Sequence, residues 1–220
     1  MKKRFFALLL SAVLTAALLC PSAMAWTATK VDMSKVTVDT GASSWAVSEL
    51  AKAAEAGLIP ALTSDPGYQD AITREQFAEL AVNLVVKCGI AIPPDGESFD
   101  DCDNPNVVLA AGAGIVSGIG DNKFAPKTAT NREQIATMIY RAISYIKEQR
   151  GIDLAPLAAS IEGYTDKGDV SDWAVNGVGA LAANGIMKGT SDTTLSPKNP
   201  CTVEQSIILI YRLYEAYQAN

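Results

Sequence analysis

The chain contains no histidine, so the usual general base of enzymes and a frequent metal ligand are both missing. This absence excludes Ser-His and Cys-His nucleophilic sites and the common zinc-hydrolase ligand sets. An enzyme would have to work with carboxylates alone, and most of these stand where helix caps and turns are expected. The sequence therefore predicts a protein that is not an enzyme and that holds neither a metal nor a cofactor.

Long apolar runs are also scarce, and one occurs at the N-terminus. Three basic residues precede an apolar run over residues 5–20, and the small side chains at 23 and 25 fit a signal-peptidase site. The run is short for a membrane span, so a retained anchor is the weaker interpretation. We expect a signal peptide over 1–25, secretion to the cell wall or S-layer, and no transmembrane segment after cleavage.

Positive charge is in short supply, with 18 Lys and Arg residues against 24 Asp and Glu residues. Loss of the three basic leader residues would change the formal net charge from −6 to about −9. Nucleic acid is therefore not an expected partner. Local basic residues can still bind an anion on an acidic protein.

Cysteine is rare, and three residues remain after the predicted leader: Cys88, Cys102 and Cys201. An odd number cannot pair completely within one chain. Cys88 and Cys102 flank a loop rich in Pro and Gly, which allows a local disulfide in an exported protein. The alternative is that all three are small buried residues. The sequence leaves both interpretations open.

A phrase of nine residues occurs three times, as "ITREQFAEL" from Ile72, "TNREQIATM" from Thr130 and "CTVEQSIIL" from Cys201. In each copy an N-cap residue stands three positions before a glutamine that can reach back to it. These pairs are Thr73 with Gln76, Asn131 with Gln134, and Thr202 with Gln205. Each copy therefore predicts the start of a helix.

Apolar residues follow each cap at helical spacing. The predicted stripes are Phe77, Leu80, Ala81, Leu84 and Val85; Ile135, Met138, Ile139, Ala142 and Ile143; and Leu209, Ile210, Leu213 and Tyr214, with Ser206 at the position of Phe77. Three equivalent stripes most simply bury against each other.

A shorter helical phrase precedes each capped helix: "SSWAVSELAKAAEAG", "NPNVVLAAGAG" and "SDWAVNGVGALAANG". Each ends at a glycine that suits a left-handed C-terminal position. Each unit also begins with an aromatic or branched residue and an acid, as in "VD" at 38, "FDD" at 99 and "YTD" at 164. The repeated unit is thus a helix, a Gly-rich turn, a short extended segment and a capped helix.

This ordered set of features resembles three partly degenerate S-layer homology (SLH) repeats. The family phrase runs F-x-D, W-A, N-G-I-x-x-G, F-x-P and I-T-R-x-E, and the match extends from about Val38 to Tyr214. After a short N-terminal segment, 26–37, the repeats span 38–90, 91–150 and 151–220, which we call units 1, 2 and 3. The resemblance implies an all-α fold of three helix-loop-helix units in a pseudo-threefold arrangement around a central three-helix bundle.

The resemblance also implies a function. Family members bind secondary cell-wall polysaccharide, often pyruvylated, in grooves between repeats, and so hold exported proteins on the bacterial envelope without a covalent bond. The implied partner is this polysaccharide or a peptidoglycan-linked polymer, with another envelope protein as a further candidate. The alternative is a structural or protein-interaction module whose degenerate grooves no longer bind glycan.

Two arginines are the candidate residues for an anionic sugar. A carboxylate is well matched by a planar guanidinium, and Arg74 and Arg132 stand in the first turn of capped helices, where free backbone amides are expected beside them. The adjacent Glu75 and Glu133 complete the resemblance to the family's site. The alternative is that these arginines only pair with Asp70 or with the adjacent glutamates.

Two tryptophans are the candidate plates for a sugar ring. Trp45 and Trp173 each stand twelve residues before the closing glycine of their unit. An indole can stack on the apolar face of a sugar. From the residues alone, however, packing inside the protein is the favoured role for a large aromatic on an amphipathic helix.

Each copy departs from the family pattern at a different place. Unit 3 has Val203 where units 1 and 2 have arginine, unit 2 lacks the tryptophan, and unit 1 has Ala61 in place of the second glycine. The apolar pattern is intact in all three. We therefore expect repetition to serve the architecture first and ligand chemistry to persist around Arg74 and Arg132.

Overall fold

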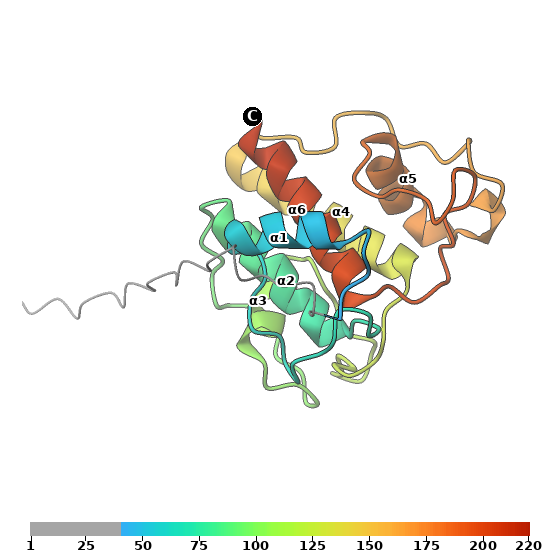
Figure 1. The fold of residues 1–220 in the computed structure, drawn as a ribbon. Helices are drawn as coiled ribbons and strands as arrows, with labels where there is room; N and C mark the ends of the chain where they lie inside the picture. Colours follow the sequence, from blue (N-terminus) through green and yellow to red (C-terminus); the bar gives the residue numbers. More distant parts are fainter. Residues whose placement is uncertain (1–40) are drawn as a thin grey trace, which may run out of the picture.

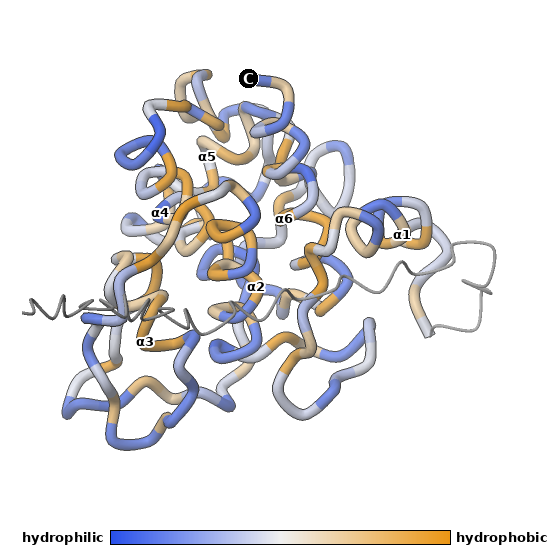
Figure 2. The backbone as a smooth tube through the Cα atoms, turned by 90° about the vertical axis from the view of Figure 1, so that its left-hand side faces the viewer, coloured by the Kyte–Doolittle hydropathy of each residue, from blue (hydrophilic) through white to orange (hydrophobic). Residues whose placement is uncertain are grey.

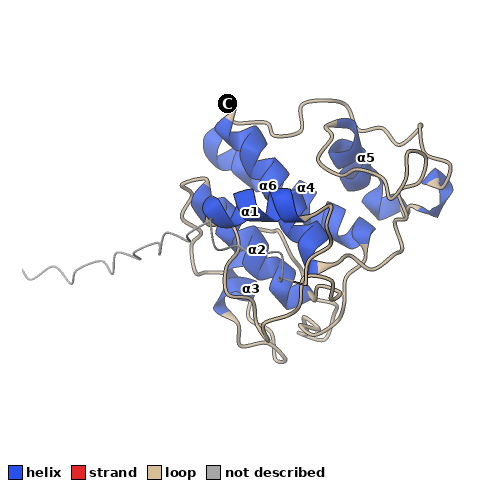
Figure 3. Cartoon of the chain, in the orientation of Figure 1, coloured by secondary structure: helices blue, strands red, loops and turns tan. Residues whose placement is uncertain are grey.

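The computed structural model describes residues 41–220 (Figure 1). The predicted signal peptide, the short segment 26–37 and the first acid motif at 38 lie outside the described residues. Within residues 41–220 the regular elements are helices joined by long loops, and extended backbone pairs only as isolated bridges (Figure 3). The predicted all-α class is confirmed for this part of the chain. None of the helices here is both long enough and apolar enough to cross a membrane.

The helices alternate between two kinds. Three longer central helices are α2 (Arg74–Lys87), α4 (Arg132–Arg150) and α6 (Val203–Gln218). Three shorter lobe helices precede them, α1 (Val47–Glu55), α3 (Pro105–Gly112) and α5 (Val175–Ala183), and two 3-10 turns, η2 (Lys167–Asp169) and η3 (Asp172–Ala174), lead into α5. The order of elements matches the predicted repeats.

Each central helix begins with the predicted capping box. The side chains of Thr73, Asn131 and Thr202 accept from the N3 backbone N–H, and the N3 glutamine side chain accepts from the N-cap backbone N–H. A capping box satisfies two N-terminal donors at once and fixes where the helix begins. All three predicted helix starts are therefore confirmed.

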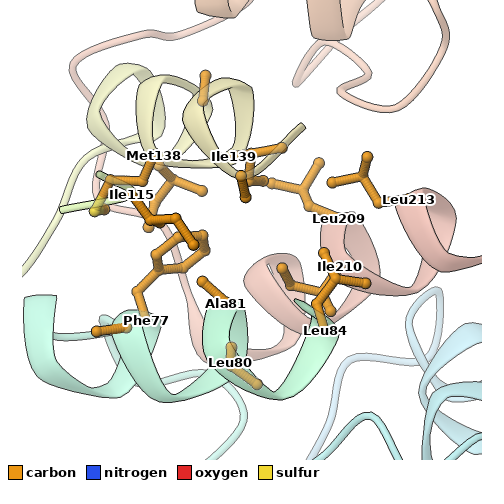
Figure 4. Close-up of a cluster of buried hydrophobic side chains, with 14 of the residues drawn as sticks. Phe77, Leu80, Ala81, Leu84, Ile115, Met138, Ile139, Leu209, Ile210 and Leu213 are labelled. Atoms are coloured by element: carbon orange, nitrogen blue, oxygen red, sulfur yellow. The ribbon is translucent and has the colours of Figure 1, made fainter. Parts of the chain in front are cut away.

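The predicted stripes of the central helices form the core. Phe77 and Ala81 of α2 point towards Met138 and Ile139 of α4 and towards the apolar face of α6 (Figure 4). Apolar residues concentrate along the central helices, whereas the outer loops are hydrophilic (Figure 2). Every stripe residue is buried except Tyr214, which is partly buried. Burial of these side chains is the main stabilising contribution to the fold.

A closed cycle of backbone hydrogen bonds joins the three units just before their central helices. Ile72 donates to the Cys201 carbonyl at 2.9 Å, Cys201 donates to Thr130 at 3.0 Å, and Thr130 donates to Ile72 at 2.9 Å. All three residues are buried. Each unit therefore supplies one donor and one acceptor that only the other two units satisfy. Pseudo-threefold symmetry of the complete units stays a prediction.

The first two backbone N–H groups of each central helix also donate hydrogen bonds to a neighbouring unit. The N–H groups of Arg74 and Glu75 donate to carbonyls of unit 2, those of Arg132 and Glu133 to unit 3, and those of Val203 and Glu204 to unit 1. The third amide of each helix bonds to the N-cap side chain. The expectation of free backbone amides beside Arg74 and Arg132 is therefore wrong. Neighbouring loops occupy these donors because a buried helix end must be satisfied.

The lobe helices end at the predicted glycines. Gly57, Gly114 and Gly185 have φ angles of +68°, +67° and +69°, a left-handed conformation that is strained for residues with a Cβ. The three cysteines after the leader are buried and free. The local disulfide between Cys88 and Cys102 is thus not formed, and the alternative of small buried residues is confirmed.

Two acids of the predicted F-x-D motif hold the F-x-P loop of their own unit. Each carboxylate accepts two backbone N–H bonds: Asp101 from Phe124 and Ala125 at 2.8 and 2.9 Å, and Asp166 from Leu195 and Ser196 at 2.9 and 2.7 Å. The bond from Phe124 is the main cause of a lowered pKa at Asp101. At Asp166 burial alone would raise the pKa, but the two backbone bonds outweigh it and lower the pKa.

These lowered pKa values predict an acid-sensitive fold. Their stabilisation is fully present above the unfolded Asp pKa of about 3.9, and it is lost as the pH falls through the lower folded values. Asp101→Asn should be less stable than the wild type at pH 7, and this difference should shrink towards pH 2. Urea midpoints from pH 7 to pH 2 measure it. A difference that stays constant over this range would show that Asp101 does not stabilise the loop as a carboxylate.

Candidate binding grooves

Arg74 and Arg132 make the same contacts in two different joints between units. Arg132 Nε donates to the Leu195 carbonyl and Nη2 to the Lys188 carbonyl, both at 2.8 Å. Arg74 Nε donates to Phe124 and Nη2 to Ser117, again at 2.8 Å. Each guanidinium thus fastens its own unit to the loop of the next unit. The alternative of pairing with Asp70 or the adjacent glutamates is wrong, because the partners are backbone carbonyls.

The two arginines differ in their surroundings. Arg132 is buried, with 6% of its surface exposed, whereas Arg74 is partly buried and its guanidinium lies 4.6 Å from the centre of the Phe124 ring. Burial lowers the pKa of both guanidinium groups. The charge of Arg141 lowers the pKa of Arg74 further.

The glutamates next to these arginines also join units. Glu133 accepts from the Ser171 N–H at 2.9 Å and hydroxyl at 3.1 Å, and it pairs with Lys198 Nζ at 2.5 Å. Glu75 accepts from the Asn104 side chain at 2.9 Å. Both partners, Ser171 and Asn104, stand at the start of the next unit's lobe segment. Glu75 and Glu133 therefore hold the lobes in place, and direct contact with a glycan stays a prediction.

The two tryptophans lie at the surface. Trp45 is 55% exposed and Trp173 is 56% exposed. Packing inside the protein, which the residues alone favoured, is therefore wrong. The preceding serines explain the placement, because Ser43 binds the Glu204 carboxylate with its N–H at 2.8 Å and its hydroxyl at 2.7 Å. This contact holds the start of the lobe on α6 and leaves the indole at the surface.

One cleft is lined by residues of all three units and contains two of the predicted site residues, Trp45 and Arg132. Its volume is about 420 Å³, and we call it the α6 groove because α6 forms one wall. Its lining consists of Trp45 from unit 1, Arg132 from unit 2, and Lys188, Gly189, Thr190, Gln205, Ile208, Leu209 and Arg212 from unit 3. Three of these side chains are cationic and none is acidic. The groove therefore offers an aromatic plate beside positive charge on a protein of net negative charge.

Arg212 is held rigidly at this groove. Its Nε and Nη2 bind the two carboxylate oxygens of Glu49 at 2.8 and 2.9 Å, and Nη1 donates to the Ile186 carbonyl at 3.1 Å. The bond to Arg212 is the main cause of a lowered pKa at Glu49. A bidentate pair of this kind fixes the plane of the guanidinium. Arg212 is thus positioned before any ligand arrives.

Corresponding residues surround α4 at a second joint, which we call the α4 joint. Trp173 lies in η3, which packs against α4, and Arg74 binds the loop at Ser117. Arg141 occupies the helix position of Arg212, and Gly177 that of Glu49. A Cβ at Gly177 would lie 3.1 Å from the Ala136 carbonyl oxygen, so an acid there would crowd the α4 backbone, which would have to shift by a few tenths of an ångström. No ion pair involving Arg141 occurs within the described residues 41–220.

Sequence reasoning missed Arg212, Arg141 and Lys188, and it treated Gln205 only as a capping residue. The repeat contained a usable indication, because "IYRA" ends at Ala142 and "IYRL" ends at Leu213, so both arginines follow the central cap by the same interval. Lys188 gave no such indication, since units 1 and 2 have proline and serine at its position.

The central and lobe helices, with clefts lined by several units, define a class of α-helical repeat protein with clefts between its units. Residues 103–136 and 163–204 match the S-layer homology domain family. Both segments therefore belong to the S-layer homology domain family. The matched segments lie in units 2 and 3, whereas the assignment of unit 1 and the exact repeat boundaries stay predictions.

Several curated proteins align with the chain. An endoglucanase of Bacillus sp. (strain KSM-635) is 28% identical over 66% of this chain and 15% of its own length. Exoglucanase XynX of Acetivibrio thermocellus is 26% identical over 78% of this chain and 16% of its own length. A cellulosome-anchoring protein of Acetivibrio thermocellus is 28% identical over 48% of this chain and 22% of its own length. The chain thus spans less than a quarter of each of these relatives.

Proposed function

We propose that this protein attaches to the bacterial cell envelope by binding an anionic cell-wall polysaccharide in its inter-unit grooves. The α6 groove carries the proposal, because exposed Trp45 lines the same cleft as Arg132, Lys188 and Arg212. An indole binds a sugar ring by stacking, and fixed guanidinium groups bind a carboxylate. A pyruvylated sugar presents both of these features on one residue.

The relatives support attachment rather than catalysis. One relative is named a cellulosome-anchoring protein, and the aligned parts of the two glucanases are small fractions of those enzymes. No enzymatic activity is proposed for the present chain. The proposed localisation, outside the cell and bound to the wall, follows from the predicted signal peptide together with the family.

Sedimentation with purified cell walls of the source organism tests the proposal. We expect the protein, without residues 1–25, to sediment with intact walls and to remain in solution when mild acid has stripped the secondary polymer. A 4,6-pyruvylated N-acetylhexosaminide should release the bound protein, and the same sugar without the pyruvate should not. Sedimentation that is equal with stripped walls would contradict the proposal, and absence of any sedimentation would direct the search to a protein partner.

A further inference from the structure

The three departures from the repeat pattern, which lie in three different units, meet at one joint. In the α6 groove, the wall and loop come from unit 3, the arginine from unit 2 and the tryptophan from unit 1. By the same assembly, the joint around α2 takes its wall and loop from unit 1, its first-turn residue from unit 3 and its lobe start from unit 2. These contributions are Ala61 in place of glycine, Val203 in place of arginine, and Asn106 in place of tryptophan, since Asn106 follows Asn104 by two residues as Trp173 follows Ser171. We call this place the α2 joint.

Hydrogen bonds confirm that these parts belong together. The Val203 N–H donates to the Asp70 carbonyl, as the Arg132 N–H donates to Asn199. Asn104, the N-cap of α3, binds Glu75 of α2 in the way that Ser171 binds Glu133. The α2 joint is thus built on the same scaffold as the α6 groove and the α4 joint but carries different side chains.

A hydrogen-bond network spans the α2 joint at the position of a cleft. Glu79 accepts from the Thr63 N–H at 3.0 Å and hydroxyl at 2.5 Å, and from the Asn104 side chain at 2.6 Å. Asn104 also reaches the Thr63 hydroxyl at 3.4 Å, and Gln76 donates to the Thr63 carbonyl at 2.8 Å. The loop of unit 1 is therefore bonded directly to the lobe of unit 2.

Glu79 is the residue that makes this closure possible. It is only 5% exposed, and its position on the helix is occupied by Thr137 in α4 and by Ile208, a lining residue, in the α6 groove. A buried carboxylate is stable only when its oxygens are bonded, which Thr63 and Asn104 achieve. Arg212 is likewise replaced by Asn83, which bonds to the Gly57 carbonyl at 3.1 Å within its own unit.

We infer that the α2 joint is a closed structural lock and that the protein therefore presents two glycan sites, at the α6 groove and at the α4 joint, where Trp173, Arg74 and Arg141 correspond to Trp45, Arg132 and Arg212. This inference rests on the proposed function for the number of sites. The lock itself rests on the bonds among Thr63, Glu79 and Asn104. The three departures from the repeat pattern are far apart in the sequence. Together they remove one glycan site, and a set of hydrogen bonds between units stands in its place.

Titration of the ¹⁵N-labelled protein, without residues 1–25, with the 4,6-pyruvylated N-acetylhexosaminide counts the sites. We expect the indole N–H signals of Trp45 and Trp173 to shift, while the Thr63 amide and the Asn104 side-chain amide do not. A shift of the Thr63 and Asn104 signals would overturn the inference, as would a shift of one tryptophan alone. If no signal shifts, the proposed function fails. The closed α2 joint is then tested by thermal unfolding alone.

Thermal unfolding tests the lock without any ligand. Glu79→Gln and the nearly isosteric Thr63→Val should each lower the melting temperature by about 4 to 8 °C, because each leaves buried groups without a full set of bonds. Glu162→Gln, which alters an exposed ion pair with Lys167, is the matched control and should change the melting temperature by less than about 2 °C. Unchanged melting of both Glu79→Gln and Thr63→Val would overturn the lock.

Discussion

Replacing both Trp45 and Trp173 with alanine should abolish sedimentation with intact cell walls and leave the fold unchanged. Both side chains are more than half exposed, so their loss should change the free energy of unfolding by no more than about 0.5 kcal/mol. Each single replacement should weaken binding about tenfold, since a stacked tryptophan commonly contributes 1 to 2 kcal/mol. The double variant should lose more than the product of these factors, because one polymer can engage two sites.

Leu157→Ala is the matched control for the tryptophan variants. Leu157 is a large apolar side chain with 59% exposure, and it lies in the segment between α4 and η2, outside the lining of the α6 groove. It should bind walls as the wild type does. Equal loss of binding in the Leu157 and tryptophan variants would indicate a general effect of surface hydrophobicity. If the double variant bound cell walls as fully as the wild type, the inter-unit sites would not be the binding sites.

Arg132→Ala should destabilise the protein by about 3 kcal/mol, an effect that has nothing to do with a ligand. The change removes two charge-assisted hydrogen bonds and leaves the Leu195 and Lys188 carbonyls at the joint without their donors. Urea unfolding followed by circular dichroism measures the loss. Arg132→Lys should recover little of it, because one ammonium cannot reproduce the planar pair of donors.

The stability of Arg132→Ala is compared with that of Arg74→Ala and Arg141→Ala. Arg74 makes the same two bonds but is less buried, so its loss should cost about 1 to 2 kcal/mol. Arg141 is exposed, and its replacement should leave stability within about 0.5 kcal/mol of the wild type while weakening wall binding. If Arg132→Ala proved as stable as the wild type, its side chain would not be the fastening between units 2 and 3.

The family, the helices and the core were within reach of the sequence because each depends on local patterns. Each capping box, at Thr73, Asn131 or Thr202, is formed within four consecutive residues and fixes where one helix begins. The apolar stripes then follow at helical spacing. These features repeat three times, so chance similarity is excluded. The C-terminal glycines of the lobe helices were predictable for the same reason, since a left-handed backbone needs a residue without a Cβ.

The roles of the candidate site residues were not within reach in the same way. The resemblance placed the arginines and the tryptophans in a site, while the residues alone favoured packing of the tryptophans in the interior. The structure has the guanidinium groups of Arg74 and Arg132 bonded to loop carbonyls and the indoles exposed. A side chain's partner in this fold usually belongs to another unit, far away in the sequence. No local pattern identifies the carbonyl that a guanidinium will reach.

The sequence by itself determined the three capped helices, and it predicted three similar units that are each incomplete in their own way. Only the tertiary structure decided that the three defects share one joint, because the α6 groove combines a wall, an arginine and a lobe from three different units and the other two joints follow the same assembly. A departure from the repeat pattern therefore lies in one unit of the sequence but changes a joint that residues of all three units form. The physical reason is that the units exchange their helix-end hydrogen bonds in a cycle, which places each unit's polar residues at its neighbours' surfaces.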